Sequence, residues 1–144
     1  MLNSVLVNFY ERDIRKLIEE VSLYKEEKNL WETRGSVKNS TGNLVLHIIG
    51  GMNYLIGSLL AHTGYVRYRD LEFIRKGVDR KELVTQLEQL IPLIVNTLNT
   101  IHLEADYPIE FDGEIRSNSY VLVQLSLHLN YHLGQVNYLR RIME

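Results

Sequence analysis

The sequence predicts an all-α protein, a single four-helix bundle, and three observations lead to this prediction. Apolar residues recur every three or four positions in four separate stretches, which is the spacing of one face of an α-helix. The four stretches are similar in length, and neither an internal repeat nor a convincing sheet pattern interrupts them. The chain has 144 residues, enough for one domain with one core and too few for two. We therefore expect residues 1–144 to form one domain of helices joined by long connections.

The first helix is expected over residues 2–28, with charged side chains opposite its apolar stripe. The stripe comprises Leu2, Val5, Leu6, Phe9, Ile14, Leu17, Ile18 and Val21. Residues 31–40 are polar and irregular and are interpreted as a connection, with Trp31 covering one end of the core.

The second helix is expected to begin at Ser40 or Thr41, either of which can cap it, and to end near His62 or Thr63. Its apolar residues run nearly all the way round, so we expect it to be buried on most sides. Residues 64–78 have a mixed composition that predicts no particular element.

The third helix is expected to open at Asp79, which with Glu82 resembles a capping box. Its apolar stripe runs over residues 83–101. Pro92 lies inside this stripe and lacks a backbone donor, so we expect a kink there.

The connection over residues 104–116 contains an Asp-Gly turn signal at 112–113 between alternating apolar residues, which predicts a small β-hairpin. The fourth helix is expected to begin at Ser117 or Ser119 and to end near Arg141.

The composition excludes several functional classes. Sixteen basic residues balance eighteen acidic ones without a long basic run, so a nucleic-acid ligand is not expected. The absence of cysteine excludes disulfides, a thiolate nucleophile from the protein and a cysteine-rich zinc site. The N-terminus lacks a secretory pattern, and the apolar stretches are interrupted before the roughly 18 residues of a membrane span. We expect a cytoplasmic protein that binds no membrane.

His128 and His132 lie four residues apart on one helix, so both side chains leave the same face one turn apart. That face also carries apolar residues, so we expect both imidazoles to point into the bundle. This spacing allows both to bind one metal ion. The alternative is two core histidines, each hydrogen-bonded to a carbonyl or a polar neighbour. His47 lies on the second helix with Asn43 one turn away.

Three mid-helix glycines, at 50, 51 and 134, lie near these histidines in the sequence. They indicate either a cavity and close approach at the site or merely tight helix packing. His62 is about 22 Å along the helix from His47 at 1.5 Å per residue, and His102 follows the third helix in a polar turn. Both are expected on the surface.

Two segments carry a resemblance to a known family. Residues 39–50 read N-S-T-G-N-L-V-L-H-I-I-G, and residues 128–135 read H-L-N-Y-H-L-G-Q. Together they resemble a poorly characterised branch of the DinB superfamily, of the DinB/YfiT type. Trp31 and the segment 69–73 also fit this pattern.

The resemblance implies a bundle of DinB/YfiT type in which His47, His128 and His132 bind one divalent metal ion, nickel or zinc in the first place. It also implies a homodimer. Asn43 and Gln135 are expected to supply hydrogen bonds around the site.

Characterised relatives in that superfamily include S-transferases that use low-molecular-weight thiols such as bacillithiol or mycothiol, and metal-dependent hydrolases. The resemblance thus favours a metal-dependent enzyme acting on a small-molecule substrate with an open three-histidine site. The alternative is a non-catalytic, metal-stabilised bundle that acts as a binding or stress-response module. No acidic residue is expected near the site as a general base.

Overall fold

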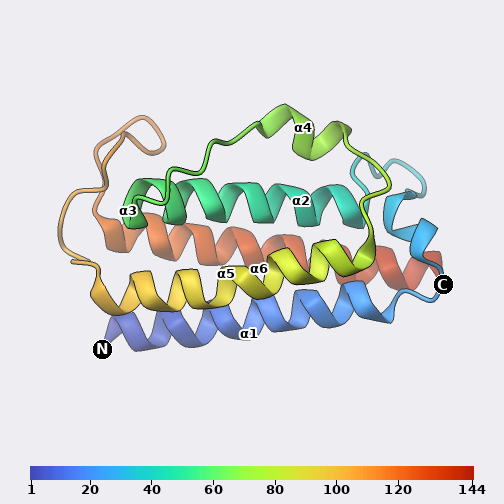
Figure 1. Ribbon diagram of the computed structural model, residues 1–144, viewed down its shortest axis with the longest axis horizontal. Helices are drawn as coiled ribbons and strands as arrows, with labels where there is room; N and C mark the ends of the chain where they lie inside the picture. The colour runs from blue at the N-terminus through green and yellow to red at the C-terminus, as the bar shows by residue number, and fades with distance from the viewer.

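Four long helical stretches lie side by side along the length of the molecule (Figure 1). The computed structural model describes all residues from 1 to 144. The first stretch is α1 (Leu2–Leu23), and the last two are α5 (Arg80–Thr100) and α6 (Asn118–Met143). The second is a continuous helix made of α2 (Thr41–Met52), a π-helical segment (Asn53–Ser58) and α3 (Leu59–Ala61). The prediction of an all-α protein is confirmed.

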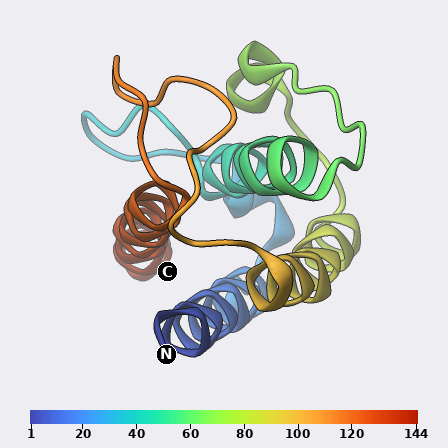
Figure 2. The same ribbon diagram turned by 90° about the vertical axis from the view of Figure 1, so that its left-hand side faces the viewer.

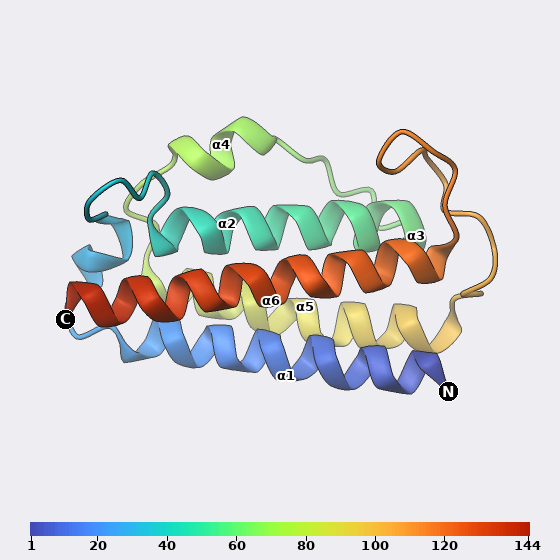
Figure 3. The same cartoon turned by 180° about the vertical axis from the view of Figure 1, so that it is seen from behind.

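Two short helices lie in the connections: a 3₁₀ turn (Glu27–Trp31) before α2, and α4 (Arg69–Ile74) before α5. The chain after α3 returns along the outside of α2 before it enters α5, so α4 covers α2 on the side away from α1 (Figures 1 and 2). Consequently α1 and α6 run in one direction, and α2 and α5 in the other (Figure 3).

One cluster of 31 buried hydrophobic residues fills the space between the four stretches. α1 contributes a stripe at the expected spacing, which comprises Leu6, Tyr10, Ile14, Leu17 and Val21. The first residues predicted for the stripe (Leu2, Val5 and Phe9) are exposed. α1 also ends five residues earlier than predicted, because the chain turns at Tyr24, whose buried hydroxyl lies 2.7 Å from Thr41 Oγ1.

The cap predicted for α2 is confirmed, since the Ser40 side chain accepts a hydrogen bond from the Asn43 backbone N–H. Trp31 packs against the core with its ring over Gly42, at the start of this helix. The stretch Thr41–Ala61 is long and apolar enough to cross a membrane, so the expectation that no stretch reaches that length is wrong. In the most apolar part of this stretch, 56% of the residues are buried inside the protein, which is consistent with a core helix of a soluble protein.

The capping box predicted for the third helix is wrong. Asp79 occupies the cap position of α5 but makes no side-chain cap bond, and the Glu82 carboxylate instead accepts a bond from Gln86 on the next turn. α5 continues as one helix through Pro92. At α6, Ser117 is the cap, as predicted, and its hydroxyl accepts a bond from the Tyr120 backbone N–H.

The β-hairpin predicted for residues 104–116 does not form. Only two isolated bridges join this connection, Asp106 with Ser117 and Phe111 with Glu114, and no strand results. The Asp112-Gly113 turn is present, with both residues in the left-handed region (φ 53° and 77°). The connection is held to the bundle by Tyr107, whose hydroxyl donates to the Leu55 carbonyl.

Candidate metal centre

The structure brings the three predicted histidines together from two helices. His47 comes from the middle of α2, and His128 and His132 come from successive turns of α6, which lies against α2. One ring nitrogen from each histidine lies within 4.8 Å of the other two. Two nitrogens bound to one zinc ion lie at most about 4.2 Å apart, so a small side-chain shift would bring all three to one ion.

Gln135 sets the orientation of His132. The Nδ1 of His132 lies 2.7 Å from Gln135 Oε1, and its Nε2 lies 2.9 Å from the Nε2 of His128. Because the amide oxygen accepts, Nδ1 carries the proton and Nε2 presents its lone pair. The hydrogen bond expected from Gln135 is therefore found, and it directs the other nitrogen of His132 toward His128.

Glu72 plays the same part for His47. Its Oε1 lies 3.0 Å from His47 Nδ1, which leaves Nε2 of His47 free to bind a ligand. Arg67 donates to both carboxylate oxygens of Glu72 at 2.9 Å, so Glu72 is ionised and held in one orientation. The side chain of Glu72 is only 8% exposed, and burial of this kind requires such a partner.

The sequence placed no acidic residue at the site as a general base, and Glu72 instead serves as a hydrogen-bond partner of His47, a role that the sequence analysis missed. Glu72 and Arg67 lie in the region 64–78, where the sequence has no helical or strand period from which to place them. The one available signal was the segment 69–73, which contributes to the family resemblance and contains Glu72.

Gly50 makes room for Glu72. A Cβ atom at Gly50 would overlap the Oε2 atom of Glu72, so a side chain here would displace the Glu72 carboxylate. By contrast, a Cβ at Gly134 would meet nothing within 4 Å. Of the two explanations for the glycines, close approach at the site applies to Gly50. The element that approaches Gly50 is α4 and not one of the other long helices.

Asn43 does not contact the imidazoles, and the hydrogen bonds of its side chain go to other partners. Its side-chain amide donates to the carbonyls of Glu72 (3.0 Å) and Arg75 (2.8 Å). Its oxygen accepts from Lys76 Nζ and from the Ser40 hydroxyl. Asn43 therefore fastens α4 to α2 and acts on the site through the placement of Glu72.

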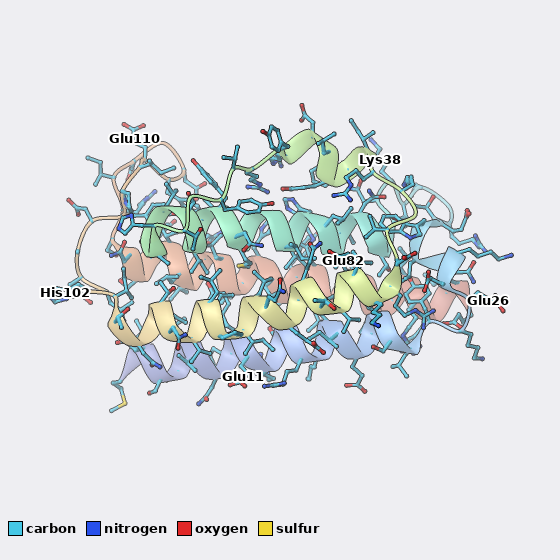
Figure 4. The ribbon with its side chains drawn as sticks, viewed as in Figure 1. Glu11, Glu26, Lys38, Glu82, His102 and Glu110 are labelled. Carbon is cyan, nitrogen blue, oxygen red and sulfur yellow. The ribbon has the colours of Figure 1, made fainter.

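Two polar residues beside the histidines on α6 and the two other histidines of the chain do not join the cluster. Asn130 donates to Asp13 on α1, and the Tyr131 side chain points outward and is 63% exposed. His62 ends α3 in the left-handed conformation and is exposed. His102 lies at the end of the molecule, where the chain passes from α5 to α6 (Figure 4). The exclusion of His62 and His102 from the site is consistent with these positions.

The electrostatics favour neutral imidazoles at His47 and His128. Burial lowers the pKa of His47; the bond to Glu72 acts in the opposite direction, and the neighbouring His132 adds to the lowering. Partial burial also lowers the pKa of His128, followed by the charges of His132 and Arg69. His128 is nevertheless an exposed residue, contrary to the expectation that it points into the bundle. Neutral imidazole is the form that binds a metal ion.

The histidines can be reached by ligands from two pockets. One pocket, of about 360 Å³, is lined by His47 and His128. The other lies on the far side of His132 and includes Gln135. The donor set fits a divalent ion such as zinc or nickel, because imidazole suits both and two of the rings have their second nitrogen bonded outward, as metal-binding histidines do.

Comparison with known proteins identifies the family of this chain. The family described as "Protein of unknown function (DUF1572)" matches the chain over residues 2–144. The chain belongs to this family. DUF1572 is grouped with the DinB-like families, which agrees with the resemblance found in the sequence, and its description gives no activity. No curated protein and no solved structure matches the chain.

Proposed function

We propose that this DUF1572 protein is a metal-dependent enzyme of DinB type, in which His47, His128 and His132 bind one divalent ion. The observation that carries the proposal is the arrangement of hydrogen bonds around the imidazoles. Glu72 and Gln135 each accept from an Nδ1, and one ring nitrogen of each histidine lies within 4.8 Å of the other two. If these histidines were only hydrogen-bonded core residues, there would be no reason for three imidazole rings to face one another.

Three protein ligands leave at least one coordination position for water or substrate, which is typical of catalytic and not of structural sites. A bound ion would supply one of two kinds of chemistry: lowering the pKa of a water toward 7, or holding a small thiol as its thiolate. Since the chain has no cysteine, any thiol must come from a cosubstrate. These two kinds of chemistry correspond to two proposed reactions, hydrolysis by the bound water and S-transfer from the bound thiol.

The protein's own groups have distinct tasks in this proposal. Glu72 and Gln135 fix the tautomer and orientation of His47 and His132. Arg67 holds the carboxylate of Glu72 in place through its two hydrogen bonds. His128 has no hydrogen-bond partner other than His132, so it is the ligand that can adjust its position most freely.

An alternative has one observation in its favour. The candidate ligands come from α2 and α6, so a bound ion would link two long helices and could stabilise the fold without catalysis. His128→Ala separates the two functions. The enzyme hypothesis predicts a folded variant without turnover, whereas the structural hypothesis predicts loss of the fold together with the metal.

The homodimer implied by the resemblance is part of the proposal. The outer face of α6 exposes four large apolar side chains, each 60–67% exposed: Leu127, Tyr131, Tyr138 and Ile142. A second copy packed on this face would cover them. Light scattering of the purified protein should then give twice the mass of one chain, and Tyr138→Glu should lower it.

The function is tested with a panel of thiols and small electrophiles. Bacillithiol, mycothiol, glutathione and coenzyme A are each assayed with nickel- or zinc-loaded protein, and ester and amide hydrolysis is measured in parallel. Turnover should disappear in His128→Ala and persist in His62→Ala, which removes an exposed histidine away from the site. Metal-loaded protein that turns over none of these substrates, and a His128→Ala variant that unfolds, would favour the structural alternative.

A further inference from the structure

The pocket beside His47 and His128 combines an apolar wall with arginines. Its apolar side chains come from the second helical stretch (Met52 of α2 and Leu55 of the π-helical segment), from α6 (Leu125 and Leu129) and from the connection before α6 (Phe111). Arg67 lies two residues before α4 and Arg69 is the first residue of α4, and both line the same pocket. A small molecule that reaches the histidines from this side therefore contacts both an apolar surface and guanidinium groups.

The two arginines are in different states. Arg67 is bonded to both oxygens of Glu72, and its side chain is only 14% exposed, so its charge is compensated. Arg69 takes part in no ion pair and in no side-chain hydrogen bond of the structure, and it is exposed. Arg69 is therefore the uncompensated positive charge of this pocket.

Phe73 holds Arg69 beside the histidines. The Arg69 guanidinium lies over the Phe73 ring at 5.5 Å from its centroid, and the same ring lies 4.9 Å from the ring of His47. A cation over an aromatic ring uses the face of the guanidinium and leaves its N–H edge free to donate. The edge of Arg69 is thus available to a ligand in the pocket.

The acidic residue that lines the pocket is Asp112, at the turn of the connection between α5 and α6. It forms no ion pair with Arg69, so it does not take up the guanidinium edge. The free donors of Arg69 remain the strongest unmatched group near the histidines.

We infer that this pocket binds the substrate and that Arg69 binds an anionic group of the substrate. A carboxylate is the anionic group that we propose first. The planar guanidinium donates two parallel hydrogen bonds to a carboxylate, and the body of the substrate packs on Met52, Leu55 and Phe111. The inference rests on the proposed function, because it places the reacting group at His47 and His128. It narrows the substrate class to small molecules with an acidic group on an apolar chain.

The test compares two four-carbon thiols, one ending in a carboxylate and the other in a neutral hydroxyl group. 4-Mercaptobutyrate and 4-mercaptobutanol are titrated into the cobalt(II)-loaded protein, and binding is followed by the thiolate-to-cobalt absorption band. The wild type should bind the carboxylate about 10-fold more tightly than the alcohol, as expected for one charge-assisted contact that is partly exposed. In Arg69→Gln the ratio of the two dissociation constants should fall to near one.

Arg141→Gln is the matched control. Arg141 also lies over an aromatic ring, that of Tyr138 at 5.4 Å, but it does not line this pocket. This variant should keep the wild-type preference. Cobalt content and circular dichroism of each variant show that the centre and the fold remain.

The outcomes separate the inference from the proposed function. Wild-type protein that takes up no cobalt contradicts the proposed function, and the inference falls with it. Cobalt-loaded protein without charge preference, or a preference that persists unchanged in Arg69→Gln, contradicts the inference alone. Loss of cobalt in Arg69→Gln also contradicts it, because Arg69 would then build the metal centre and not the substrate pocket.

Discussion

The two sides of the bundle differ in what they bury. On the side of α1 and α5 the buried residues are almost all apolar, with Asp13 and Thr97 as the polar exceptions. The side formed by α2, α4 and α6 buries polar groups close to one another, among them Asn43, Glu72 and His132. Buried polar groups destabilise a protein unless they are hydrogen-bonded, so their concentration on one side marks the site.

The polar groups of the second side form one connected network. Lys76 and Ser40 bond to Asn43, and Asn43 in turn holds the backbone of Glu72. The side chain of Glu72 then holds His47. The comparison teaches that the α1–α5 side supplies stability, whereas the docking of α4 on α2 and the geometry of the histidines belong to a single arrangement.

The largest effect on stability is expected on the α1–α5 side. Leu87 of α5 is fully buried, so Leu87→Ala should lower the free energy of unfolding by about 2–5 kcal/mol. Metal bound per folded chain should not change. Urea denaturation measures the stability, and elemental analysis measures the metal bound per folded chain. A large loss of bound metal in this variant would contradict the separation between the two sides.

Gly50→Ala should act mainly on the other side. The added methyl group would displace Glu72 and thereby free His47, so metal affinity should fall about 10–100-fold, as for other losses of a group that orients a metal ligand. Isothermal titration with zinc measures the change.

Gly134→Ala is the matched control for that substitution. It replaces a mid-helix glycine on α6, where the methyl group would meet nothing. It should leave metal affinity unchanged and stabilise the helix by up to about 1 kcal/mol. Equal losses of metal affinity in both alanine variants would show that Gly50 has no special relation to Glu72.

Gln135→Ala should have a smaller effect than Gly50→Ala, because Gln135 is a neutral acceptor and Glu72 an ionised one. We expect about a 10-fold loss of metal affinity, near the lower limit for such groups, with little change in stability. The same zinc titration measures it. A loss larger than that of Gly50→Ala would reverse the order of importance assigned to the two supporting residues.

The parts of the fold and site that the sequence predicted are those with a local period or a local cap. His128 and His132 are one turn apart on a helix, and Ser40 and Ser117 cap their helices through bonds to residues three positions away. Each of these relations lies within a few residues, so the sequence pattern shows it directly.

The parts that could not be predicted depend on distant contacts. Glu72 reaches His47 across 25 positions because Asn43 fastens α4 to α2, and no period in residues 64–78 signals that docking. The apolar length of Thr41–Ala61 is different, because it is a property of the sequence alone and could have been recognised there. What the sequence does not show is that neighbouring helices bury this stretch.

The central claim is that the three histidines bind one metal ion, and elemental analysis of protein purified without a histidine tag tests it most directly. We predict about one divalent ion per chain. Its content should fall sharply in His47→Ala, His128→Ala and His132→Ala and should remain in His62→Ala and His102→Ala, which lie outside the cluster. Full retention of the ion in all three single variants of the cluster would contradict the account.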